Sequence, residues 1–206
     1  PVEGEGTADP CLVVDRDTGR IWCAITWAKD VGWYNSKPGF GNDSFHNYLI
    51  YSDDDGVTWS DAIDITTSMK AEDWISAWFS PGAGLQTKSG RLLIPYSAAH
   101  SRSQVYSYAV VSDDHGKTWQ RVGPMGLKTN ENMVSQLENG TLICNMRSTA
   151  GLNQRAISQS SDDGNSWSPL LHDPNLIEPV CQASTLAIPS ANTPDGREWL
   201  LFCNPA

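Results

Sequence analysis

Three acidic octapeptides are the first part of this sequence whose residue types could carry chemistry. They share the pattern Ser-x-Asp-x-Gly-x-Thr/Ser-Trp and occupy residues 52–59, 112–119 and 160–167. In the first copy, successive carboxylates precede Gly56, and carboxylate oxygens are typical calcium ligands. An EF-hand loop, however, needs acidic or amide side chains at alternate positions before its glycine and a glutamate about six residues after it. Tyr51 and Ala62 occupy two of those positions, so the sequence predicts no metal site here.

A tight turn is the structure that these residue types favour. Glycine adopts positive φ without steric cost, and aspartate and serine side chains form hydrogen bonds with nearby backbone N–H groups. The tryptophan that ends each copy is a large apolar anchor for neighbouring chain segments. The copies start 60 and 48 residues apart (112 − 52 and 160 − 112), and a repeat at such intervals indicates an array of similar units.

The segments around the octapeptides have the pattern of β-strands, and no window shows convincing helical periodicity. Pairs of apolar runs joined by short turns predict hairpins at residues 11–27, 84–96, 134–146 and 184–203. Further apolar runs lead directly into the octapeptides at residues 48–51, 105–111 and 155–160. Each unit therefore contains a hairpin, a third strand that ends in the octapeptide, and a fourth that begins at its tryptophan. Four antiparallel strands per unit are typical of a propeller blade.

Composition and charge exclude several classes of partner. The net charge of −10 argues against nucleic acid or an anionic membrane, and no apolar run approaches the length of a membrane helix. The five cysteines lack metal-ligand spacing and lie in apolar or strand-like segments, so we expect them to be core residues. The histidines expected at the surface are His46, His115 and His172.

The repeated octapeptide is identified as the Asp box, and the chain resembles the sialidase (neuraminidase) superfamily of six-bladed β-propellers. The resemblance extends beyond the boxes to residues 8–19, 80–95 and 130–147. It implies an all-β fold in which residues 1–206 form part of a single propeller domain. About four of the four-stranded antiparallel blades would be present, with blades missing at both ends.

The resemblance also implies an exo-α-sialidase, which releases terminal sialic acids with retention of configuration. The sugar carries a carboxylate, and an arginine guanidinium binds a carboxylate in bidentate geometry. In the family a tyrosine is the nucleophile, a neighbouring glutamate accepts its proton, and an aspartate acts as acid and base. Glu131 matches that glutamate, and Arg147, 16 residues later (147 − 131), matches the second of the carboxylate-binding arginines. Glu131 and Arg147 are therefore the candidate catalytic residues, with Arg147 also binding substrate.

Further residues match positions near the sugar pocket of the family. Asp9 matches a position that contacts the hydroxyl edge of the sugar in bacterial relatives, and Tyr96 and His100 follow a strand near the pocket lining. Asp9 and Tyr96 are accordingly expected to bind substrate. Residues expected to pack or to lie at the surface, without a direct role, are Arg91, Arg155, Trp74, Trp78 and Phe79.

The rest of the catalytic set is expected outside these residues. The first arginine and the acid/base aspartate would precede Pro1, and the third arginine and the tyrosine would follow Ala206. The implied partners are sialylated glycans, glycoproteins or glycolipids, no cofactor is implied, and the implied compartment is secreted, periplasmic or lysosomal-type. No signal peptide is visible in the sequence. The alternative is a non-catalytic Asp-box propeller that binds glycans or other proteins.

Overall fold

The computed structural model describes residues 4–205, which form four β-sheets and two single-turn helices. The prediction of an all-β fold is confirmed. The helices are α1 (Thr66–Met69) and the 3₁₀ helix η1 (Ser190–Asn192). Within the described range, no helix is long and apolar enough to cross a membrane.

The first sheet has the strand order β4-β3-β2-β1-β6. Its strands are β1 (Glu5–Val14), β2 (Ile21–Lys29), β3 (His46–Ser52), β4 (Ile63–Asp64) and β6 (Gly82–Ala83). β1 to β4 are antiparallel neighbours in chain order, whereas β6 pairs with β1 in parallel. The predicted hairpin at residues 11–27 is confirmed.

The second sheet has the order β10-β9-β8-β5, and β7 also pairs with β8. Its strands are β5 (Ser76–Phe79), β7 (Leu85–Gln86), β8 (Leu92–Ser101), β9 (Gln104–Ser112) and β10 (Gln120–Leu127). β5 and β7 pair with successive parts of β8, and between them the chain leaves the sheet so that β6 can join β1. The sequence did not predict this detour.

The third sheet has the order β11-β12-β13-β14, and the fourth contains β15 and β16. These strands are β11 (Thr129–Gln136), β12 (Leu142–Ser148), β13 (Gln154–Ser160), β14 (Leu171–Ile177), β15 (Ser184–Ile188) and β16 (Trp199–Cys203). In the first three sheets an octapeptide joins the last two antiparallel strands in chain order, as the repeat predicted.

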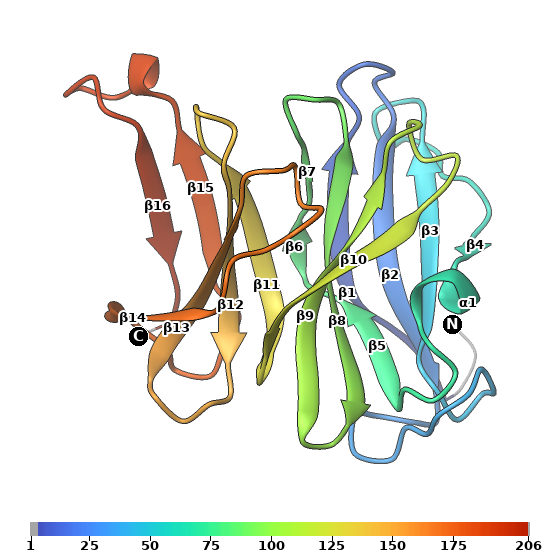
Figure 1. Ribbon diagram of the computed structural model, residues 1–206. Helices are drawn as coiled ribbons and strands as arrows, with labels where there is room; N and C mark the ends of the chain where they lie inside the picture. Colours follow the sequence, from blue (N-terminus) through green and yellow to red (C-terminus); the bar gives the residue numbers. More distant parts are fainter. Residues whose placement is uncertain (1–3, 206) are drawn as a thin grey trace.

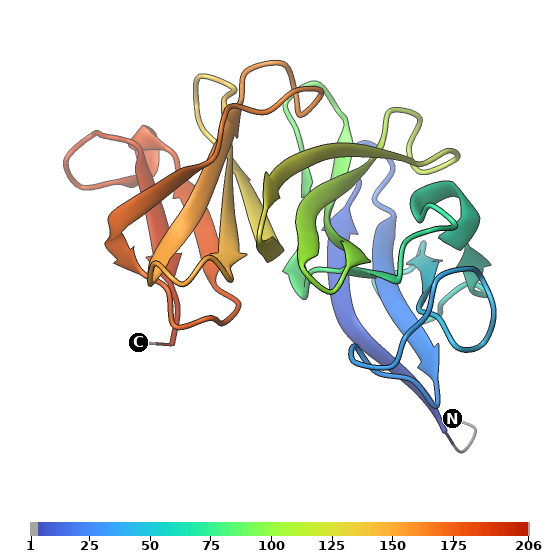
Figure 2. The ribbon, with the colours of Figure 1, turned by 60° about the horizontal axis from the view of Figure 1, so that its bottom comes forward.

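The four sheets stand side by side in chain order. The first lies on the right of Figure 1 in blue and cyan, the fourth lies on the left in red, and Figure 2 shows that the sheets follow an arc. Each sheet therefore packs against its neighbours in the sequence, as in repeat architectures.

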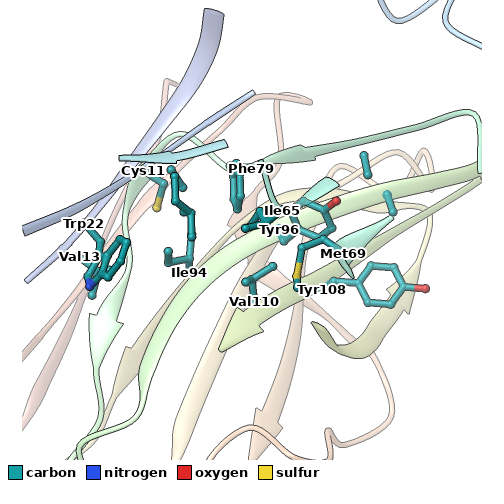
Figure 3. Close-up of a cluster of buried hydrophobic side chains, with 14 of the residues drawn as sticks. Cys11, Val13, Trp22, Ile65, Met69, Phe79, Ile94, Tyr96, Tyr108 and Val110 are labelled. Carbon is teal, nitrogen blue, oxygen red and sulfur yellow. The ribbon is translucent and has the colours of Figure 1, made fainter. Parts of the chain in front are cut away.

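The core lies between the sheets, because the strands of the second sheet bury both faces. Along β9, Tyr108 and Val110 belong to the cluster shared with the first sheet, whereas Ala109 and Val111 belong to the cluster shared with the third. This alternation is the two-residue period of a β-strand. Figure 3 shows the first cluster, which includes Phe79. The predicted packing role of the aromatic residues near β5 is confirmed for Trp74, Trp78 and Phe79, which are all buried.

Each octapeptide forms the same hydrogen-bonded turn. In the second copy the Ser112 hydroxyl donates to Asp114 Oδ1 at 2.8 Å, and the Thr118 hydroxyl donates to Oδ2 at 2.6 Å. The Gly116 N–H donates to the Ser112 oxygen at 2.8 Å, with Gly116 at a φ of 85°. The first and third copies repeat these bonds. The prediction of a turn is confirmed, and its central aspartate is held by donors of the turn itself.

A second set of contacts ties the second and third octapeptides to the sheet before each of them. His115, the fourth residue of the second copy, lies with Nδ1 2.8 Å from Oδ2 of Asp15 in the β1–β2 turn. At the same position of the third copy, Asp163 accepts a 2.5 Å bond from Ser89 in the β7–β8 turn. The side-chain oxygens of Gln86 and Gln136 likewise accept bonds from backbone N–H groups of the preceding sheet. In the opposite direction, Nη1 of Arg91, directly before β8 of the second sheet, donates to the Asp163 carbonyl at 2.9 Å. Side chains of both neighbours therefore join successive sheets along this rim.

Cysteine burial differs in part from the prediction. Cys11, Cys23 and Cys144 are buried, but Cys181 and Cys203 are exposed. The prediction of a core position is wrong for these two, because they flank or end strands of the two-stranded fourth sheet, which leaves much of its surface open.

His46 is buried, so the prediction that it lies at the surface is wrong. Its ring lies edge-on to Trp27 with 5.3 Å between centroids, and its Nε2 lies 3.1 Å from the carbonyl oxygen of Gly41. His115 is exposed and His172 is half-buried.

Candidate active site

Glu131 and Arg147 form an ion pair on neighbouring strands. Nη1 of Arg147 in β12 lies 2.7 Å from Oε2 of Glu131 in β11, and both side chains are about a quarter exposed. The β11–β12 register shifts by one residue between Thr129 and Asn132, so two residues of β11 face Arg147. This β-bulge places Glu131 opposite Arg147, and bulges commonly aim side chains at functional sites. The structure therefore brings both predicted catalytic residues together.

The guanidinium of Arg147 keeps a free donor in this arrangement. Among the residues that the structure describes, its buried Nε has no hydrogen-bond partner, and neither does Oδ1 of Asn130, which precedes Glu131 in sequence. Because Nε is buried, an entering carboxylate would have to compete with Glu131 for the terminal nitrogens of Arg147.

Asp9 lies at a second bulge, in β1. The β1–β2 register shifts by one residue between Ala8 and Cys11, and Asp9 adopts a φ of 55°, a conformation that only glycine, asparagine and aspartate take readily. Burial, and next the negative charge of Glu131, raise the pKa of Asp9 to about 6. The structure thus brings Asp9 into the electrostatic field of the Glu131–Arg147 pair.

The detour of the second sheet connects these two bulged strands. Gly82 pairs with Cys11, and the N–H of Gly84 donates to the Leu12 carbonyl at 2.8 Å. From the other side, the N–H of Asn132 donates to the Ser80 hydroxyl at 3.0 Å. Residues 80–84 therefore bridge the strand of Asp9 and the strand of Glu131.

A cavity of about 570 Å³ opens beside Asp9. Its volume falls within the range of small-molecule sites. The residues that line it are Gly4, Glu5, Gly6, Thr7, Ala8, Asp9, Thr26, Ala28, Asp30, Val31 and Phe45. The polar side chains among them are Glu5, Thr7, Asp9, Thr26 and Asp30. Of the predicted site residues, Asp9 lines the cavity, whereas Glu131 and Arg147 do not.

Tyr96 does not line the site, and the prediction that it binds substrate is wrong. Its side chain is fully buried, its hydroxyl donates to Asn47 Oδ1 at 2.7 Å, and burial raises its pKa well above the usual range. His100 also belongs to the packing: its ring stacks on Trp74 at 4.3 Å, and Nε2 lies 2.9 Å from the Tyr108 hydroxyl. β8 buries both of its faces, as its nearly continuous apolar run indicates.

A buried ion pair contacts the strand of Arg147, and no feature of the sequence predicted it. Nη1 of Arg155 lies 2.5 Å from Oε2 of Glu178, and both side chains are at most 1% exposed. The sequence assigned Arg155 a structural or exposed role, and it is structural. Glu178 was not singled out, because its partners lie 23 and 30 residues away in the sequence.

The arrangement has the parts needed to handle a substrate carboxylate and a proton. A partly exposed guanidinium binds an anionic oxygen pair, and a carboxylate next to it can accept a proton from a neighbouring hydroxyl. Asp9 adds a second carboxyl group that can bond hydroxyl groups of a ligand.

Comparison with known proteins finds relatives along the whole chain. The family described as BNR repeat-like domain matches residues 2–206. A sialidase of Bacteroides fragilis is 32% identical over 100% of this chain, and a sialidase of Micromonospora viridifaciens is 31% identical over 98% of it.

Among solved structures, the Hadza microbial sialidase Hz136 is 35% identical and superposes with a TM-score of 0.88 over 97% of this chain. The chain covers 40% of that structure, 39% of the Bacteroides protein and 33% of the Micromonospora protein. It therefore spans about a third to two fifths of the length of these relatives.

Proposed function

This chain belongs to the sialidase superfamily, as part of a BNR repeat-like domain, and from that membership we propose that the intact protein is an exo-α-sialidase. Such a glycoside hydrolase releases terminal sialic acids from glycans, glycoproteins or glycolipids. We propose for the domain a single six-bladed propeller, of which residues 1–206 form about four blades. The four sheets that pack side by side support this architecture (Figure 2); residues 1–3 and 206 lie outside the described part.

The main observation in favour of this function is the Glu131–Arg147 pair at the bulge in β11. In the proposed reaction, Arg147 binds the carboxylate of sialic acid, and Glu131 accepts the proton of a tyrosine nucleophile outside these residues. The phenolate would attack the anomeric carbon, the glycosidic bond would break, and the leaving oxygen would take a proton from the acid/base aspartate outside these residues. Water would then hydrolyse the tyrosyl intermediate, with net retention. Asp9 would bond hydroxyl groups of the sugar.

The ion pair suggests how substrate binding and activation are connected. Without substrate, one oxygen of Glu131 is engaged by Arg147. An entering carboxylate competes for the same guanidinium, and the Glu131 oxygen released in this exchange becomes available to a phenol proton. A phenol has a pKa near 10, so such a base is needed at neutral pH.

The test is turnover of an aryl sialoside by the intact protein and its variants. We expect Glu131→Gln to lower kcat by about 10²–10⁴-fold, because an amide cannot accept the proton. Arg147→Lys should mainly raise KM, because lysine offers no bidentate contact. The matched control is Glu138→Gln, since Glu138 is exposed in the turn of the same β11–β12 hairpin and should leave both constants unchanged.

Two outcomes would contradict the proposal. Turnover by Glu131→Gln at the wild-type rate would remove this residue from the mechanism. Binding of sialosides by the intact wild-type protein without any turnover would indicate a non-catalytic glycan-binding propeller instead.

A further inference from the structure

The buried Arg155–Glu178 pair is the most enclosed ionic contact that the structure describes. Arg155 is fully buried and Glu178 is 2% exposed. Burial lowers the pKa of Arg155, and the adjacent charge of Glu178 opposes this effect. A buried pair seldom adds net stability, because removing two charges from water costs about as much as their attraction returns. Net stability therefore does not explain why an ion pair is buried at this position.

The pair holds the strand of Arg147 from both sides. The Nε of Arg155 donates to the side-chain oxygen of Asn145 at 2.7 Å, two residues before Arg147. Oε2 of Glu178 accepts a 3.2 Å bond from the N–H of Ser148, the residue after Arg147. The residues that flank Arg147 are thus fixed by one buried ionic unit.

The same unit holds the loop between β14 and β15. Cys181 donates its N–H to Oε1 of Glu178 at 3.0 Å, and its carbonyl accepts a 2.8 Å bond from Nη1 of Arg155. The next residue, Gln182, donates from Nε2 to the Pro81 carbonyl at 2.8 Å. This loop is therefore fastened to residues 80–84, which bridge the strands of Asp9 and Glu131.

A closed circuit of bonds results. Asn132, the residue after Glu131, bonds to Ser80, and Pro81, the residue after Ser80, bonds to Gln182. Cys181, the residue before Gln182, bonds to the buried pair, which bonds to the residues that flank Arg147. Arg147 closes the circuit through its ion pair with Glu131. Arg155 also keeps one buried nitrogen, Nη2, without a partner in the described part of the chain. The negative charge of Glu131 also acts on Arg155, as one of the charges that raise the pKa of this arginine.

We propose that Arg155 and Glu178 are positioning residues that hold the guanidinium of Arg147 in the geometry for binding a substrate carboxylate. They act through Arg147 and do not touch the substrate. This inference rests on the proposed function of Arg147. A misplacement of about 1 Å in a binding group can reduce activity by about 10²-fold, so an enclosed support behind such a group has a direct catalytic effect.

The experiment uses the intact protein with three changes: Arg155→Lys, the double change Arg155→Met with Glu178→Leu, and Arg147→Lys. The double change leaves no unpaired buried charge, so it keeps the fold testable even if Arg155→Lys is unstable. For each variant, kcat and KM for an aryl sialoside are measured, with inhibition by sialic acid and by its methyl ester. The ratio of the two inhibition constants reports directly on recognition of the carboxylate.

We expect both Arg155 variants to raise KM and to lower kcat/KM by about 10²-fold. Both variants should weaken inhibition by sialic acid but not inhibition by its methyl ester, so the preference for binding the acid should fall. In the Arg147→Lys background, Arg155→Lys should cause little further loss, because residues that act through one another are not additive. Arg91→Met is the matched control, because Arg91 pairs with Asp113 at the rim and should affect only the melting temperature.

The inference is overturned if the two Arg155 variants keep the wild-type preference for the acid, or if the losses from Arg155 and Arg147 multiply in the combined variant. Failure of the proposed function looks different. In that case the wild-type protein itself neither turns over the sialoside nor distinguishes the acid from its ester.

Discussion

At the scale of single residues, Asp9 combines a restricted backbone with a perturbed acid. Its positive φ arises from the bulge in β1, and its pKa is raised by burial and by Glu131. Asparagine tolerates this conformation about as well as aspartate does, keeps the size of the side chain and removes the charge. The residue can therefore be neutralised without disturbing the strand.

We expect Asp9→Asn to stabilise the protein above pH 6. The folded-state pKa of about 6 exceeds the usual 3.8, so ionised Asp9 costs stability progressively as pH rises from about 4 to 6. Because the group is partly solvated, we expect a gain of about 1 kcal/mol, or roughly 2–4 °C in Tm, which disappears below pH 4. The kcat/KM profile should also lose its limb near pH 6.

The control for Asp9 is Asp30→Asn, because Asp30 has a φ of 53° and lines the same cavity. Melting curves and pH–rate profiles of both variants should differ. An identical pH dependence in the two would show that Asp9 is not the group responsible.

At the scale of elements, the octapeptide is a self-contained turn. Its bonds join residues at most four positions apart, so residue types alone were enough to predict it. In the second copy, hydrogen bonds from the hydroxyl and N–H of Thr118, and then from Ser112, lower the pKa of Asp114 to about 2, although burial opposes them.

Asp114→Asn should therefore destabilise the protein at neutral pH and lose this effect in acid. A carboxylate with a depressed folded-state pKa contributes stability above its unfolded value near 4, and this contribution is lost as pH falls towards 2. Solvent screening limits the effect to about 1 kcal/mol, or roughly 2–4 °C in Tm at pH 7. Asp61→Asn, at an exposed position just after the first copy, is the control. A difference in Tm that persisted unchanged at pH 2 would contradict the assignment.

Features that depend on contacts between residues far apart in the sequence could not be predicted in this way. The bulges at Asp9 and Glu131 depend on one extra residue in one strand, which a pattern of alternating residues does not reveal. Tyr96 was assigned to the pocket by the resemblance alone. The apolar sequence of β8 does not alternate, so it could not show towards which side of the strand each residue points. Glu178 was missed because its partners come from β12 and β13, and only the folded sheet brings them near.

At the scale of the whole molecule, Tyr96 joins three sheets. Its hydroxyl donates to Asn47 in the first sheet, whose Nδ2 donates to the Ala77 carbonyl in the second. Its carbonyl accepts a 3.0 Å bond from Asn132 in the third. A fully enclosed polar group of this kind is costly to leave without a partner.

Tyr96→Phe should lower stability without affecting catalysis. The change leaves Oδ1 of Asn47 buried without its donor, which costs about 1–3 kcal/mol. Thermal melting and sialoside kinetics of the intact protein measure the two effects, with Tyr34→Phe as control because Tyr34 is 90% exposed. A loss of kcat/KM with unchanged Tm would instead indicate that Tyr96 takes part in binding the substrate.

The rim contacts between sheets run both ways along the sequence, and this has a consequence for how the sheets fold. His115 and Asp163 reach back to turns that precede them, whereas the guanidinium of Arg91 reaches forward to the Asp163 carbonyl. The first sheet also takes its edge strand β6 from the segment between β5 and β7. The first sheet is therefore complete only after residue 83 has been made, so we expect the first two sheets to fold together as one cooperative unit.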